Sequence, residues 1–76
     1  MRRIAVRTAD FRLSFHLMRE LKRRECNFVM LSPGDKWDGI LLTSPEEVRD
    51  GEIPVVEENI EIAVERAIQS SRGLDS

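Results

Sequence analysis

The stretch from Ile4 to Leu31 constrains the fold more than any other part of the chain. Its pattern predicts a short apolar strand at Ile4 to Val6 or Arg7, an amphipathic helix from about Asp10 to Cys26, and a second apolar strand at Phe28–Leu31. Neither strand alternates with polar residues, as expected of strands buried on both faces of a parallel sheet. Two parallel strands joined by a helix form a right-handed crossover unit. We therefore predict an α/β fold.

The helical assignment depends on the whole stretch, because its beginning alternates like a strand. At 100° per residue, five apolar side chains fall within an arc of roughly 160°, and Leu13 lies at its margin. Thr8 or Asp10 can cap the start of the helix, and basic residues at its end suit the helix dipole. We expect this arc to be the apolar face of the helix: Phe11, Phe15, Leu17, Met18 and Leu21.

The third strand, Gly39–Thr43, follows a turn at Ser32–Lys36. It forms either an antiparallel hairpin with the second strand or, by a loop that crosses under the sheet, a parallel neighbour of the first. Its continuous apolar run favours the parallel position. The strand order is then 2-1-3-4, as in flavodoxin-like sheets.

The remaining elements extend this sheet. Ser44–Glu47 predicts a short helix, with Ser44 as its cap and Glu47 completing a capping box. Pro54 places the fourth strand, Ile53–Val56, at an edge. A last helix begins near Asn59, buries Ile60, Ala63, Val64, Ala67 and Ile68, and stops at Gly73. We predict one Rossmann-like or flavodoxin-like domain over residues 1–76, in two or three layers, with a mostly parallel four-stranded sheet, two main helices and one short helix.

Two long helices are few for a sheet that is apolar on both faces. If both lie on one face, little more than residues 45–50 covers the other, and monomers rarely expose so large an apolar patch. We therefore predict a homodimer, or docking on a partner domain, through the uncovered sheet face. One cysteine excludes an internal disulfide, which fits the cytoplasm, and no apolar run is long enough to span a membrane.

Charge is divided unevenly along the chain. Residues 1–36 hold nine Lys and Arg against four Asp and Glu, whereas residues 37–76 hold three against ten. This division predicts either a surface with one basic side, or electrostatic pairing between copies, or neutralisation of the two halves within the fold. We favour neutralisation, because charge patterning alone is weak support for a partner.

Two groups of residues are candidate binding sites. Arg12, His16, Arg19 and Arg23 form one line along the solvent side of the first long helix, and such a line could follow the phosphates of a nucleic acid. A solvated helix face explains the same line. The loops after the first and third strands could bind a small anion where the chain direction reverses, although helix capping explains three of their side chains. This second group is Arg7, Thr8, Asp10, Thr43 and Ser44.

Catalytic and metal-binding signatures are not found. One His and one Cys leave poor material for a Ser-His-Asp arrangement or a zinc site, and there is no glycine-rich phosphate loop. Trp37 could stack on a base or, more simply, cover the end of the core. We expect Cys26 to be inert, and we expect no catalytic residue, metal or cofactor.

Four segments resemble an uncharacterised archaeal family: Ile4–Ser14, Glu20–Arg24, Phe28–Pro33 and Leu42–Glu47. In its longer members, a domain of this kind precedes a ribonuclease H-like domain. None of the four segments is a catalytic motif, so no active-site residue carries over. The resemblance implies an accessory or assembly module, in agreement with a non-catalytic interaction domain.

Overall fold

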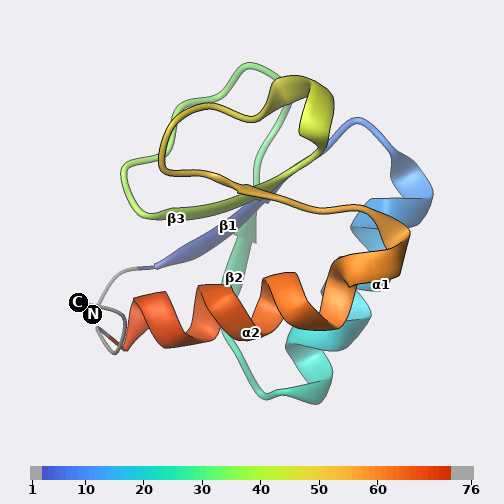
Figure 1. The fold of residues 1–76 in the computed structure, drawn as a ribbon, viewed down its shortest axis with the longest axis vertical. Helices are drawn as coiled ribbons and strands as arrows, with labels where there is room; N and C mark the ends of the chain where they lie inside the picture. Colours follow the sequence, from blue (N-terminus) through green and yellow to red (C-terminus); the bar gives the residue numbers. More distant parts are fainter. Residues whose placement is uncertain (1–2, 73–76) are drawn as a thin grey trace.

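The computed structural model describes residues 3–72, and its four strands run parallel in the order β2-β1-β3-β4 (Figure 1). In the central strand, Ile4 lies opposite Phe28 on one side and Ile40 on the other. The predicted fold class and strand order are therefore confirmed, and the hairpin alternative is wrong. The strands are β1 (Ile4–Arg7), β2 (Phe28–Met30), β3 (Ile40–Thr43) and β4 (Ile53–Pro54).

Both long helices, α1 (Phe11–Arg23) and α2 (Ile60–Ser71), pack on the same face of the sheet. Asp10 caps α1, because its Oδ1 accepts hydrogen bonds from the amides of Arg12 and Leu13 at 3.0 and 3.2 Å. The helix ends earlier than predicted, since Glu25 adopts a left-handed conformation with φ of 54°. Gly73, the predicted end of α2, lies outside the described residues.

The buried stripe of α1 consists of Leu13, Leu17 and Leu21. These leucines are four residues apart and share a core with side chains from β1, β3 and α2. Phe11 and Phe15 are exposed, so the prediction that they belong to the apolar face is wrong. Both lie about 120° or more from Leu17 around the helix, too far to reach the sheet.

The second face of the sheet is also closed. Ala5 and Leu41 alternate with the residues that meet the helices, yet they are only 0% and 1% exposed. Loops 31–39 and 44–52 lie on this side, opposite the helices (Figure 1). The prediction of an uncovered sheet face is therefore wrong, and any docking must use another surface.

The shorter elements follow the sequence pattern less closely. Residues Pro45–Glu47 form a 3-10 helix, but Ser44 does not cap it and instead donates its hydroxyl to Glu47 Oε2 at 3.0 Å. A second 3-10 turn, Glu57–Asn59, leads into α2. Pro54 lies in the edge strand β4, as predicted.

A closed second face predicts that Leu41→Ala lowers the free energy of unfolding by about 2–5 kcal/mol, the usual result of a cavity in a core. Val48→Ala is the matched control, because Val48 is exposed and lies outside the helices, so its truncation should cost clearly less than that of Leu41. Urea denaturation measures both values. Equal effects of the two substitutions would show that the second face is open.

Candidate functional site

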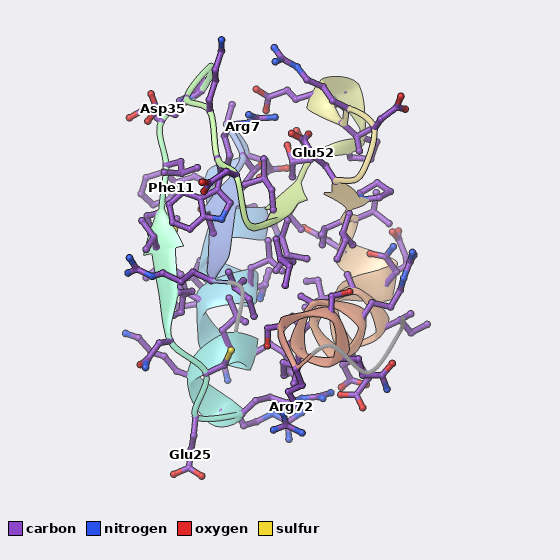
Figure 2. All side chains as sticks on the ribbon, turned by 90° about the vertical axis from the view of Figure 1, so that its left-hand side faces the viewer. Arg7, Phe11, Glu25, Asp35, Glu52 and Arg72 are labelled. Atoms are coloured by element: carbon purple, nitrogen blue, oxygen red, sulfur yellow. The ribbon has the colours of Figure 1, made fainter. Side chains whose placement is uncertain are left out.

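The carboxyl ends of β1 and β3 place Arg7 beside Thr43. The Arg7 side chain is 3% exposed and extends between the two covering loops, toward Asp35 and Glu52 (Figure 2). Its Nη1 donates to the Asp35 carbonyl at 2.6 Å, and its Nη2 donates to Glu52 Oε1 at 3.1 Å and to the Glu47 carbonyl at 3.4 Å. One guanidinium group therefore holds both loops against the second face of the sheet.

This arrangement bears directly on the predicted anion site. All five candidate residues gather at one edge of the sheet, but most of their polar atoms already have protein partners. Asp10 caps α1, Thr8 Oγ1 accepts from the Asp10 amide at 3.1 Å, and Ser44 donates to Glu47. Thr43 Oγ1 and Arg7 Nε are buried without a protein partner in the described chain. An anion would have to displace the carboxylate of Glu52, so the anion site stays a prediction.

The groove nearest to this edge is acidic. It has a volume of about 430 Å³, and carboxylates from three elements line it, including Asp10, Glu47 and Glu57. A negative wall repels small anions, because nearby unit charges of the same sign interact unfavourably. This groove gives no support to anion binding.

The predicted basic stripe lies on the solvent side of α1, where Arg12, Arg19 and Arg23 are exposed and His16 is half-buried. Across from it, the start of α2 and the turn before it carry acidic side chains. The two sets line opposite walls of one groove of about 420 Å³, which we call the charged groove. Its basic wall carries His16, Arg19 and Arg23, together with Glu20, which is paired with Arg23, and its acidic wall carries Glu57, Glu58 and Glu61.

An ion-pair network that begins on the α1 wall of this groove joins the two helices. Glu20 pairs with Arg23 at 2.7 Å and with Arg24 at 2.9 Å, and Arg24 also pairs with Glu65 of α2. The hydrogen bond from Arg23, and to a smaller extent that from Arg24, lowers the pKa of Glu20 below its ordinary value. Part of the charge division along the chain is thus neutralised within the fold, as we favoured from the sequence.

Trp37 and Cys26 have structural environments. Trp37 Nε1 donates to the Arg3 carbonyl at 3.1 Å, and the Arg3 guanidinium carbon lies 5.9 Å from the Trp37 ring centre. This packing holds the chain just before β1, in agreement with a covering role. Burial raises the pKa of the Cys26 thiol, which disfavours the reactive thiolate.

Two further findings concern residues 3–72 as a whole. No group of three or more His, Cys, Asp or Glu side chains in this range could hold a metal ion. In the same range, no helix combines the length and apolar character needed to cross a bilayer.

The helices also expose large apolar side chains. Phe11 and Phe15 of α1 are 89% and 54% exposed, and Ile62 of α2 is 65% exposed. The sequence prediction placed Phe11 and Phe15 on the apolar face of the first helix, and it made no assignment for Ile62. For Ile62 a signal was available, because it lies off the apolar face formed by Ala63, Val64, Ala67 and Ile68.

The comparisons with known proteins agree with this fold. A family model described as the response regulator receiver-like domain matches residues 3–71. No curated protein and no solved structure matches the chain. The match supports a flavodoxin-like domain, but it says nothing of archaeal origin or of a following ribonuclease H-like domain.

The contacts of Arg7 predict that Arg7→Met lowers the free energy of unfolding by about 3 kcal/mol, because it leaves Glu52 without its cation. The double variant Arg7→Met/Glu52→Gln should recover part of this loss. Hydrogen exchange at the amides of Asp35 and Glu52, both in covering loops, should become faster in the single variant. An Arg7→Met protein as stable as wild type would contradict the anchoring role.

The lowered pKa of Glu20 predicts a pH-dependent contribution to stability. A carboxyl with a depressed folded-state pKa stabilises the fold above its unfolded-state value, and the effect is lost as pH falls through the folded-state pKa. At neutral pH, wild type should therefore have a higher melting temperature than Glu20→Gln. This difference in melting temperature should disappear well below pH 4.5, the ordinary pKa of a Glu carboxyl.

Melting curves from neutral to acidic pH measure this difference. Glu46→Gln is the control, because Glu46 is exposed and forms no ion pair within residues 3–72. A Glu20→Gln difference that persists unchanged in acid would show that the ion pairs do not cause it.

Proposed function

The chain belongs to the response regulator receiver-like domain family, and from that premise we propose that it is a non-catalytic interaction domain whose helices dock on a protein partner. A receiver-like domain is a small signalling or interaction domain. The docking surface is the outer side of α1 and α2, which we call the helical face. Its partner, its mode of docking and the cytoplasmic setting expected from the single cysteine are parts of this proposal.

The exposed apolar side chains carry the proposal. Phe15 and Ile62 lie on the helical face, and Phe11 lies on the flank of α1 beside β2 (Figure 2). Each of the three exposes more than half of its area to solvent. Large apolar side chains gain free energy when a partner removes them from water, at about 25 cal/mol for each Å² buried. Aromatic residues are also enriched at protein interfaces.

Charged residues surround these apolar side chains. Arg12 and Arg19 are exposed on the turns next to Phe11 and Phe15, and Glu58, Glu61 and Glu65 lie within one turn of Ile62. Apolar residues with a polar rim are typical of interaction sites. The helical face thus offers both apolar area and charges that select a partner.

Nucleic-acid contact is a second proposal, supported by a different observation. Arg12 and Arg19 form no ion pair within the described residues, so their charge is available to phosphates. The acidic wall of the charged groove opposes nucleic-acid contact, because a phosphate backbone beside Arg19 would also approach Glu57 and Glu58.

If longer relatives carry a ribonuclease H-like domain, that domain is another candidate partner for the helical face.

The proposal predicts that Ile62→Glu and Phe15→Glu fold normally but lose a protein partner. Both side chains are exposed, so each variant should keep the far-UV circular dichroism spectrum of wild type while it places a charge within the interface. Immobilised protein, wild type or variant, is incubated with a lysate of the producing cells, and the retained proteins are identified by mass spectrometry.

Val48→Glu is the matched control, because Val48 is exposed on the loop that covers the opposite side of the sheet. A partner of the helical face is retained by wild type and by Val48→Glu and is lost from both helix variants. If every variant retains the same proteins as wild type, the helical face is not the docking surface.

A further inference from the structure

The charge pattern of the charged groove is complementary to the same groove on a second copy of the chain. One wall carries the basic side chains of α1, and the other carries the acidic side chains before and within the first turn of α2. Figure 1 shows the start of α2 next to the body of α1. The side chains of Arg19 and Glu58 are both exposed and form no ion pair within the described residues. Both are therefore available to a second molecule.

We infer that the partner of the helical face is a second copy of this chain, placed by a twofold axis that runs along the charged groove. This inference rests on the proposed function, since it names the protein that the helical face binds. When a twofold axis lies in the plane of an interface, a surface on one side of the axis faces, in the partner, the surface from the other side of the axis. The basic wall of each copy then faces the acidic wall of its partner, and the attraction is made twice.

The apolar residues of the helical face fit the same axis. Phe15 lies on the flank of α1 beyond the basic wall, and Ile62 lies at the edge of the acidic wall. The rotation that pairs the two walls also brings Phe15 of each copy toward Ile62 of its partner. The contact therefore contains two apolar pairs in addition to the charges.

The helical face is large enough for such a contact. A standard interface takes about 800 Å² of accessible surface from each partner. The described chain measures 29 × 25 × 19 Å along its principal axes and has 5246 Å² of accessible surface. An area of about 800 Å² is roughly 15% of that surface. The two helices form one side of the molecule, opposite the covering loops, and a dimer of this kind would use most of that side (Figure 1).

A nucleic acid fits the groove less well than a second copy does. A phosphate backbone that gains the attraction of Arg19 meets the repulsion of Glu57, Glu58 and Glu61 across the same groove. A second copy brings an opposite charge to each wall. Charge complementarity on both walls therefore favours a protein with this same charge pattern.

A charge-exchange experiment tests the inference. Sedimentation equilibrium of purified wild type at micromolar concentration should give twice the 8.8 kDa mass of one chain. Arg19→Glu alone and Glu58→Arg alone should each raise the dissociation constant of the dimer about tenfold or more, because each places two like-charge contacts in the interface. An equimolar mixture of the two variants should recover the dimer, since every wall then faces an opposite charge.

Arg49→Glu is the control for the change in net charge, because Arg49 is exposed on a covering loop away from the helices. It should dimerise like wild type. Failure of the mixed variants to associate, or a single-chain mass for wild type, overturns the twofold dimer. Salt-sensitive binding of wild type to duplex DNA or RNA that Arg19→Glu abolishes, without any dimer, assigns the basic wall to nucleic acid and also overturns it.

These outcomes separate this inference from the proposed function. If wild type has the mass of one chain yet retains a different protein that Ile62→Glu loses, the second copy is wrong and the docking function stands. If wild type has the mass of one chain and no retained protein depends on Ile62, both proposals fail.

Discussion

The guanidinium group of Arg7 is the contact on which the architecture of the sheet depends. Within residues 3–72 no long helix lies on the second face of the sheet, and two loops cover Ala5 and Leu41. Loops bury apolar residues only when their own backbone polar groups are satisfied. Arg7 donates to carbonyl groups in both loops and to one carboxylate, and its planar fork of donors suits this task better than a lysine. The buried guanidinium group thus holds in place the two loops that cover the face on which no long helix packs.

Coverage of one face by loops leaves both helices on the other, where their outer sides are available for binding. The inner stripe of α1 is buried by Leu13, Leu17 and Leu21, while Phe11 and Phe15 face solvent. The salt bridges of Glu20, Arg24 and Glu65 hold α1 and α2 together as one surface. The two helices therefore form one charged and partly apolar side of the molecule, which is the side to which we assign docking.

The sequence predicted those features that depend on local pattern. The continuous apolar run before Thr43 identified an inner parallel strand, and Pro54 identified an edge. Periodicity gave the relative angles of the side chains on α1 but not the direction of the sheet, so Phe11 and Phe15 were assigned to the wrong side. The role of Arg7 was missed because its partners lie 28, 40 and 45 residues away in the sequence. No local pattern contains such contacts.

The register of the sheet also determines how this chain must assemble. Ile4 pairs with Phe28 and with Ile40. Each of these strand pairings therefore brings together residues that are far apart in the sequence. Loop-closure entropy opposes each step before any ladder is formed, and folding rates fall as contacts become less local. The first half of the chain can form only one side of β1 on its own. The central strand therefore gains its second neighbour only when β3 joins, and β4 has no strand to pair with until β3 is in place.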